Sequence, residues 1–222
     1  MTPQKKFVAV AGNIGVGKST LVEMLCERLG WEPYFEPVGE NPYLEDFYGD
    51  MQSWAFHSQV YFITHRLRSH RDLINHPTSV IQDRTVYEDA EIFARNLFQR
   101  GQMTARDHAA YRELYELLTE MLGPPDLVVY LRASVHTLMS RIANRGRHFE
   151  NAISPDYLEQ LNQLYEDWID GFRYCPVLTV PADDMNYVNV PGHLDLIVEK
   201  IQSRLIGQEE VIFHPEEIAN HR

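Results

Sequence analysis

The sequence predicts an α/β protein in which a five-stranded parallel sheet is flanked by helices in three layers. Short apolar segments bounded by Gly or Pro alternate with longer segments of helical periodicity. This alternation is typical of a parallel sheet whose two faces are both covered by helices. The first apolar segment is followed by a glycine-rich turn and then by a helical segment, which indicates an anion-binding loop at the end of the first strand.

Glycine and proline residues divide the chain into its expected elements, because both interrupt regular structure. The expected strands are "KFVAVAG" at 6–12, "PYFEPV" at 33–38, "SVIQD" at 79–83, "DLVVYL" at 126–131 and "PVLTV" at 176–180. The expected helices cover 18–30, 52–75, 86–99, 104–122, 135–145, 155–170 and 192–206. We expect one domain over 1–207 that carries a lid at about 141–153, followed by a polar tail over 208–222 to which no element is assigned.

Composition narrows the class of protein. The chain has 222 residues, of which 44% are apolar, so it can bury a sizeable core. No apolar run approaches a membrane span, and "MTPQKKFVAVAG" lacks a secretory signal. Cys26 and Cys175 stand in unrelated contexts, which favours a reducing, cytoplasmic location without a disulfide framework. The net charge of -12 argues against nucleic acid as a partner.

A phosphate-binding motif follows the first strand. The stretch "GNIGVGKS" at 12–19 fits the pattern G-x-x-x-x-G-K-[ST], with a strand before it and a helix after it. Its glycines let backbone N–H groups curl around an anion at a helix N-terminus. Lys18 would reach the β- and γ-phosphates of ATP, and Ser19 would bind Mg²⁺ together with Asp83 at the end of a later strand. The expected ATP-binding residues here are Gly12, Asn13, Ile14, Gly15, Val16, Gly17, Lys18, Ser19 and Thr20.

Three arginines gather in "RIANRGRHFE" at 141–150, although the chain as a whole is acidic. Arg141 and Arg145 are four residues apart and share a helix face, and Arg147 follows the helix-breaking Gly146. Guanidinium groups match the charge that a transferred phosphoryl group spreads over its oxygens. We therefore expect this segment to be a lid that closes over the triphosphate.

With the phosphate motif, "EPV" at 36–38, "DRT" at 83–85 and "RIANRGR" at 141–147 in that order, the chain resembles the deoxyribonucleoside kinases. This family includes the deoxycytidine, deoxyguanosine and insect multisubstrate kinases. The resemblance extends over about 6–206. It implies a P-loop kinase fold and the ATP-dependent phosphorylation of a deoxynucleoside 5′-hydroxyl in nucleotide salvage. It also implies a homodimer and feedback inhibition by a deoxynucleoside triphosphate.

The resemblance assigns roles to individual residues. Glu36 matches the general base for the 5′-hydroxyl, and Arg84 matches the arginine that orients the 5′-oxygen and that carboxylate. Tyr48 and Glu150 match the pair that binds the sugar 3′-hydroxyl. A carboxylate within hydrogen-bond reach of a primary alcohol can accept its proton as the bond to phosphorus forms, so the carried-over role of Glu36 makes chemical sense.

The base pocket is assigned in the same way. Gln59 matches the glutamine that hydrogen-bonds the base, and Arg66 and Asp89 match positions that tune base choice. Gln59 and Arg66 are seven residues apart, so they share one helix face. We expect deoxyadenosine and deoxyguanosine to be preferred, with deoxycytidine next. Asp184 in "PADDMNY", after the last strand, is a further candidate for contact with the donor base.

Other functions fit less of the sequence. A GTPase would need an N-K-x-D signature, which does not occur. A nucleoside monophosphate kinase such as thymidylate kinase is the nearest enzymatic alternative, but it must bind an acceptor phosphate where this chain has the carboxylate of Glu36. A nucleotide-binding sensor without turnover would not need Glu36, Arg84 and the lid arginines together.

Overall fold

The computed structural model describes residues 5–35, 38–207 and 211–221, and in these ranges it contains a five-stranded sheet of order β2-β3-β1-β4-β5. The strands are β1 (Phe7–Gly12), β2 (Glu32–Tyr34), β3 (Val80–Asp83), β4 (Leu127–Arg132) and β5 (Val177–Pro181). All paired strands run parallel. Every residue of β1 and β3 is buried, as expected for central strands covered on both faces. The α/β fold with a parallel sheet is confirmed.

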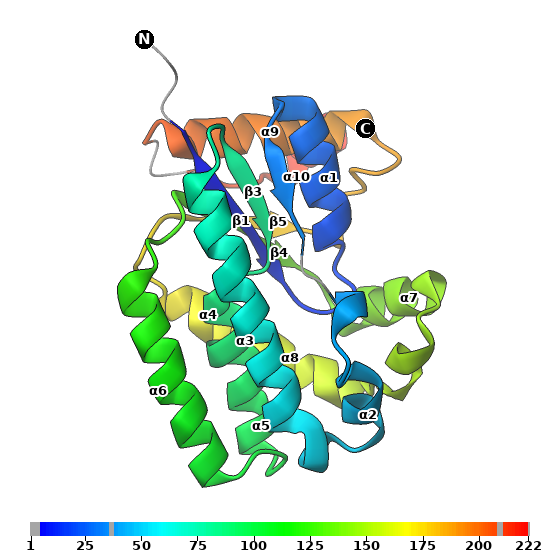
Figure 1. Ribbon diagram of the computed structural model, residues 1–222. Helices are drawn as coiled ribbons and strands as arrows, with labels where there is room; N and C mark the ends of the chain where they lie inside the picture. Colours follow the sequence, from blue (N-terminus) through cyan, green and yellow to red (C-terminus); the bar gives the residue numbers. More distant parts are fainter. Residues whose placement is uncertain (1–4, 36–37, 208–210, 222) are drawn as a thin grey trace.

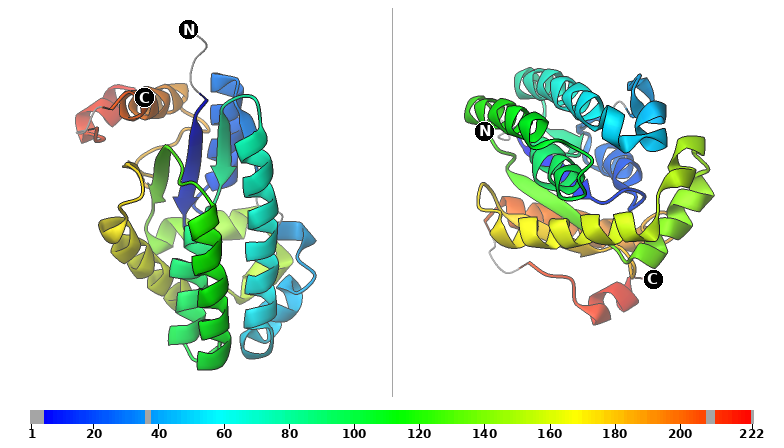
Figure 2. Two further views of the ribbon diagram at one scale, coloured as in Figure 1. Left: turned by 60° about the vertical axis from the view of Figure 1, so that its left-hand side comes forward. Right: turned by 90° about the horizontal axis from the view of Figure 1, so that it is seen from below.

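Helices cover both faces of the sheet (Figure 1). On one face, α1 (Lys18–Leu29) packs on β1, β2 and β3, and α9 (Pro191–Leu205) packs on β4 and β5. On the other side, α3 (Met51–Asn75) and α6 (Ala105–Met121) lie side by side in all three views (Figures 1 and 2). Both extend past the carboxyl ends of the strands, so they wall the space below that edge of the sheet.

The remaining elements surround the same edge. They are α2 (Leu44–Gly49), α4 (Val86–Glu88), a π-helical segment (Asp89–Ala94), α5 (Arg95–Gln99), α7 (Val135–Arg145) and α8 (Pro155–Gly171), with 3-10 turns at Val38–Glu40 and His148–Ala152. Ser134 and Ser154 cap α7 and α8 by accepting from the N–H groups of Thr137 and Tyr157, at 3.3 and 3.2 Å. Such caps satisfy backbone donors that a helix start leaves without a partner.

Three elements differ from the sequence expectation. The helix predicted over 86–99 is interrupted by the π-helical segment, which places Asp89 against α3. The strand predicted at 33–38 covers Glu32–Tyr34 and is followed by the exposed Phe35, whereas residues 36–37 lie outside the described ranges. The six-residue helix α2 was not predicted, because so short a helix carries no clear periodicity and depends on tertiary packing.

The polar tail also contains a helix, α10 (Pro215–Asn220), which packs on α9. Ile218 is buried, and Lys200 Nζ on α9 donates to Glu217 Oε1 at 2.9 Å. At Gly192 the two segments approach so closely that a Cβ would lie 2.1 Å from His221 O. Thus only glycine fits at the start of α9, and residues 211–221 are part of the packed structure rather than a detached tail.

His70 on α3 is a buried imidazole in this core. Its side chain is only 4% exposed and meets the ring of Phe7 edge-on at a centroid distance of 5.5 Å. Burial lowers the pKa of His70 to about 4, because a low-dielectric site disfavours the charged form.

The described helices include none that is long and apolar enough to span a bilayer.

We predict that His70 makes the fold sensitive to mild acid. The unfolded chain takes up a proton on this imidazole below about pH 6.5, whereas the folded chain stays neutral there until about pH 4. The contribution of neutral His70 to the free energy of unfolding is therefore fully present above about pH 6.5, and it decreases as the pH falls from 6.5 toward 4. Urea unfolding of wild type and His70→Phe at pH 7.5, 6 and 5 measures the effect.

The wild type should lose more stability between pH 7.5 and 5 than His70→Phe does. The exposed His57 on the same helix gives a matched control, and His57→Gln should follow the wild-type pH dependence. Equal pH dependence in wild type and His70→Phe would contradict the prediction.

Candidate active site

The turn between β1 and α1 has the geometry of a phosphate-binding loop. Gly12, Gly15 and Gly17 have φ angles of 146°, 82° and 103°, which side chains rarely allow. A Cβ at Gly12 would lie 2.8 Å from Leu131 O, and one at Gly15 would lie 2.6 Å from Ile142 Cγ1. The loop is thus packed against β4 and α7 so tightly that glycine is required. The N-terminus of α1, which follows the loop, lies at the carboxyl edge of the sheet.

Lys18 lies folded over this loop. Its ammonium group donates to the carbonyls of Gly12 and Asn13, at 2.8 and 3.1 Å. The side chain of Asn13 is turned away, because its Nδ2 donates to Leu158 O at 3.0 Å and to Asn162 Oδ1 at 2.8 Å on α8. The predicted ATP contact of Asn13 is therefore left to its backbone, and so is that of Val16, whose side chain is fully buried.

Ser19 and Asp83 meet as the sequence predicted. Ser19 Oγ donates to Asp83 Oδ2 at 2.5 Å, while Asp83 Oδ1 is buried without a hydrogen-bond partner among the described residues. The ranges described hold no cluster of three His, Cys, Asp or Glu side chains around one point. One carboxylate and one hydroxyl suit Mg²⁺, which binds few protein oxygens and keeps water and phosphate ligands.

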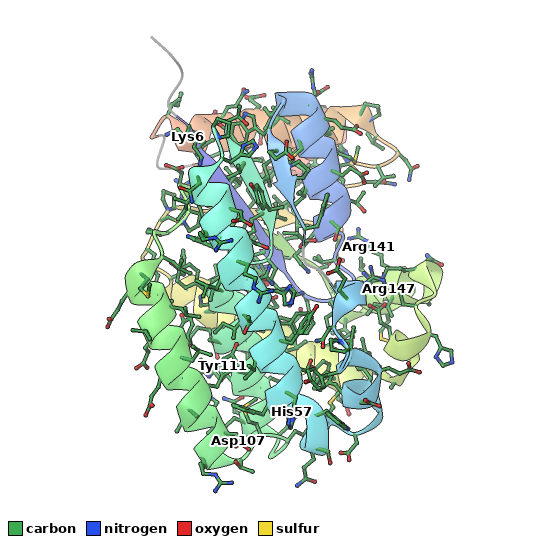
Figure 3. The ribbon with its side chains drawn as sticks, viewed as in Figure 1. Lys6, His57, Asp107, Tyr111, Arg141 and Arg147 are labelled. Carbon is green, nitrogen blue, oxygen red and sulfur yellow. The ribbon has the colours of Figure 1, made fainter. Side chains whose placement is uncertain are left out.

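Two of the lid arginines contact an acidic partner within the lid. Arg145 donates from Nε and Nη2 to the two carboxylate oxygens of the buried Glu150, at 3.1 and 2.6 Å. Arg147 Nη1 is 3.6 Å from the same carboxylate. Figure 3 shows Arg141 and Arg147 on the same side of the molecule, where α7 lies below α1. Arg145 and Arg147 line one cavity together with Gly15 and Lys18 of the phosphate loop, so their guanidinium groups lie next to that loop.

Arg141 is bound to the backbone on the other side of that loop. Its Nη1 and Nη2 donate to Val16 O and Ala182 O at 2.5 and 2.8 Å. It lines a second cavity, whose other walls include Gly15, Gly17, Thr20, Asp183, Asn186 and Tyr187. Tyr187 donates its hydroxyl to Gly17 O at 3.1 Å. Asp184 is exposed and does not line this cavity, whereas its neighbour Asp183 does.

A cavity below the carboxyl edge joins the phosphate loop to α3. The loop contributes Ile14, Gly15, Lys18 and Ser19, and the lid contributes Arg145, Arg147 and Glu150. The other predicted residues that line it come from α2, α3, the end of β3 and the segment after β3, namely Tyr48, Gln59, Asp83, Arg84 and Asp89. The Oε1 atom of Gln59 is buried and has no hydrogen-bond partner in the part of the chain that is described. Such an atom indicates a place for a ligand donor, since burying it without one is unfavourable.

Arg66 and Asp89 form a buried ion pair beside this cavity. Arg66 Nε lies 3.1 Å from Asp89 Oδ2, and both side chains are 3% exposed. Arg66 Nη1 also donates to Asp83 O at 3.0 Å. Asp89 lines the cavity, but Arg66 does not, so the guanidinium of Arg66 is adjacent to this space through its contact with Asp89.

Arg84 has a backbone conformation that is rare outside glycine. Its φ angle is 68°, and its guanidinium lies 4.2 Å from the centroid of the Phe93 ring. A non-glycine residue in this region carries strain of about 1 kcal/mol or more, which the surroundings must offset. The turn therefore presents Arg84 to the cavity at a conformational cost, as functional residues often do.

Sequence reasoning missed part of the cavity wall. Leu44, Phe47, Phe93 and Tyr157 also line it, and their spacing is that of ordinary core residues. Burial raises the pKa of Tyr157 to about 12, so its phenol stays neutral. The predicted general base, Glu36, lies outside the described residues.

The comparisons with known proteins agree with this geometry. The family described as "Deoxynucleoside kinase" is matched over residues 8–206. A deoxyadenosine/deoxycytidine kinase of Bacillus subtilis is 38% identical, over 90% of this chain and 94% of its own length. A deoxyguanosine kinase of the same organism is 32% identical, over 90% of this chain and 98% of its own length. The solved deoxyadenosine kinase of M. mycoides with bound dATP superposes with a TM-score of 0.79 at 34% identity, covering 89% of this chain and 100% of that one.

A phosphate loop, an arginine-bearing lid and a polar pocket thus share one edge of the sheet, in a chain that matches one enzyme family along most of its length. The chain belongs to the deoxynucleoside kinase family of ATP-dependent phosphotransferases.

Proposed function

We propose that this kinase transfers the γ-phosphoryl group of Mg²⁺-ATP to the 5′-hydroxyl of deoxyadenosine or deoxyguanosine, and less readily to that of deoxycytidine. One observation carries the proposal: a single cavity is lined by Lys18 and Ser19 of the phosphate loop and by the buried Gln59 and Asp89. A donor phosphate and an acceptor nucleoside can therefore meet in it. The similar kinases named for deoxyadenosine, deoxycytidine and deoxyguanosine support the choice of bases.

Base recognition rests on two buried polar groups. Gln59 offers one donor and one acceptor, which suits the paired donor and acceptor edge of adenine or cytosine. Asp89 is held in place by Arg66 at 3.1 Å, and its carboxylate would accept from an exocyclic amine. Thymine lacks an exocyclic amine, so it gains least from this arrangement. Phe62 and Phe93 supply apolar walls for a flat ring.

The sugar would lie between α2 and the lid. Tyr48 and Glu150 line the same cavity, although they are far apart in the sequence. A hydroxyl of the sugar that reaches Glu150 would find a carboxylate already fixed by Arg145. A tyrosine packed below the sugar favours deoxyribose, since it leaves little space for a 2′-hydroxyl.

The chemistry follows from positions and charges. Lys18 would leave the loop carbonyls for the β- and γ-phosphates, and Arg145 and Arg147 would approach the same oxygens from the lid. Glu36 would accept the proton of the 5′-hydroxyl, with Arg84 holding the oxygen in place. Ser19 and Asp83 would hold Mg²⁺, which would supply charge neutralisation when bound. Phosphoryl transfer of this kind depends mainly on alignment and on electrostatic stabilisation.

The proposal includes a homodimer formed by helix packing. Large apolar side chains are exposed on the two neighbouring helices α3 and α6, at Ile74, Leu117 and Met121. A second copy of the chain would remove this surface from water. Light scattering after gel filtration measures the mass directly, and a mass of one chain at micromolar concentration would contradict the dimer.

We predict that Glu36→Gln lowers kcat by about 10²- to 10⁴-fold, the usual contribution of a general base. The amide keeps the shape of the side chain but cannot take a proton, so KM for the nucleoside should stay close to that of the wild type. A steady-state panel of the four deoxynucleosides with ATP and Mg²⁺ measures both constants. Glu40→Gln, at an exposed position in the next turn, is the matched control and should retain full activity.

We predict that replacing Arg66 and Asp89 together by Leu and Val shifts base preference toward thymidine. Removing the pair together avoids leaving one buried charge without its counter-ion. The ratio of kcat/KM for thymidine to that for deoxyadenosine should rise by roughly tenfold or more. The more exposed Arg112–Glu91 pair, at 2.7 Å, provides the control. The same double exchange there should leave the ratio unchanged, and an unchanged ratio at Arg66 and Asp89 would make them a structural pair only.

A further inference from the structure

Glu88 is a completely buried carboxylate to which the mechanism above gives no role. It is the last residue of the short helix α4 and is 0% exposed. It does not line the cavity that holds Lys18, Arg84 and Gln59. A buried carboxylate is costly unless several donors satisfy it, so its partners show what it holds together.

One carboxylate oxygen holds the start of the phosphate loop. Glu88 Oε1 accepts from the N–H of Gly12 at 3.1 Å and lies 2.8 Å from the hydroxyl of Tyr165 on α8. That hydroxyl also lies 2.8 Å from the carbonyl of Gly12. Burial raises the pKa of Tyr165 well above its usual value, so the phenol keeps its hydrogen and remains a donor. Glu88 and Tyr165 thus contact both polar groups of Gly12.

The other oxygen holds the turn that carries Arg84. Glu88 Oε2 accepts from the N–H of Thr85 at 2.8 Å and lies 3.2 Å from its hydroxyl. In return, the Thr85 hydroxyl accepts from the N–H of Glu88 at 3.4 Å, which completes a capping box. This cap directly follows Arg84, whose φ angle of 68° needs support.

The two loops that Glu88 joins serve opposite sides of the reaction. Gly12 opens the loop that would bind ATP, and Arg84 would hold the 5′-oxygen of the acceptor. The β1 and β3 strands that carry them are neighbours whose paired residues end at Val10 and Asp83, and the N–H of Arg84 also donates to Val10 O at 3.0 Å. Beyond that point, the carboxylate of Glu88 links the two backbones.

We propose that Glu88 is a positioning residue for phosphoryl transfer, which fixes the phosphate loop and the Arg84 turn at one separation. The proposal rests on the proposed function, because it takes the ATP role of the loop and the acceptor role of Arg84 from it. A misplacement of about 1 Å can cost on the order of 10²-fold in rate. The bridge therefore affects the chemical step more than it affects the affinity of either substrate.

The variant Glu88→Gln tests the bridge with little change in volume. Glutamine has one acceptor oxygen and an NH₂ group, so it can accept from Gly12 or from Thr85, but not from both. We expect kcat to fall by about 10- to 100-fold, while KM for ATP and for deoxyadenosine changes by less than about threefold. Amide hydrogen exchange at Gly12 or Thr85 should also become faster, and this measurement needs no substrate.

A variant that lowers stability without touching the two loops distinguishes a positioning role of Glu88 from a role in stability alone. Leu73 is fully buried on α3 near the amino edge of the sheet, away from the cavity. Leu73→Ala should lower the urea midpoint yet keep kcat within about twofold at a temperature where it is folded. Glu88→Gln with the same retained kcat, or with unchanged exchange at both amides, would overturn the proposal.

Thr85 variants decide the question if Glu88→Gln does not fold. Thr85→Ser keeps the capping hydroxyl and should keep the wild-type kcat, whereas Thr85→Ala should lower it by about three- to tenfold with KM little changed. Equal kcat in both would overturn the proposal. If the wild type phosphorylated no deoxynucleoside, the proposed function would fail. Exchange at Gly12 and Thr85 would still show whether Glu88 joins the two loops.

Discussion

The Gly12 peptide is held by buried groups on both of its polar sides. Its N–H donates to Glu88, and its carbonyl accepts from Lys18 and lies within hydrogen-bond distance of Tyr165. A side chain at this position would collide with Leu131 O. The strand, the loop and α8 can therefore meet at only one spacing. The placement of Lys18, Ser19 and the lid relative to the acceptor cavity depends on that spacing, because each of them projects from an element fixed there.

The same edge concentrates cations in a chain of net charge -12. Lys18, Arg66 and Arg84 are all largely buried, which is costly for cations unless acceptors surround them. Arg66 meets Asp89 and the carbonyl of Asp83, and Lys18 meets two loop carbonyls. Acidic residues elsewhere make the net charge negative, while this pocket gathers cationic groups suited to a triphosphate. The arginines of the lid extend the positive region outward from α7.

The features that could be predicted from the sequence are those that depend on residues close together in the chain. The apolar strands and the glycine-rich loop follow from composition and order along the chain, and the structure confirms the parallel α/β fold that they predict. Ser19 and Asp83, the predicted Mg²⁺ ligands, lie in contact at 2.5 Å. The resemblance matched Arg66 and Asp89 to positions that tune base choice, and it matched Tyr48 and Glu150 to the pair that binds the sugar 3′-hydroxyl. The sequence does not reveal Phe93 or Tyr157 as pocket residues, because their spacing equals that of core aromatics. Nor does it reveal Glu88, whose partners at Gly12 and Tyr165 are 76 and 77 residues away. The π-helical turn at Asp89 and the docking of α10 likewise depend on tertiary contacts.

The contacts that Lys18 of the phosphate loop and Arg145 of the lid make in this structure affect how the two substrates would bind together. Lys18 is held by Gly12 and Asn13, and Arg145 is held by Glu150. When a triphosphate attracts Lys18 and Arg145, these cations exchange protein oxygens for phosphate oxygens. The triphosphate therefore does not have to remove them from water. Releasing Arg145 also frees a buried carboxylate, which then requires a donor. The 3′-hydroxyl of the acceptor sugar is such a donor if it reaches Glu150. Donor and acceptor would then favour each other's binding through this one ion pair, and the coupling must be equal in both directions.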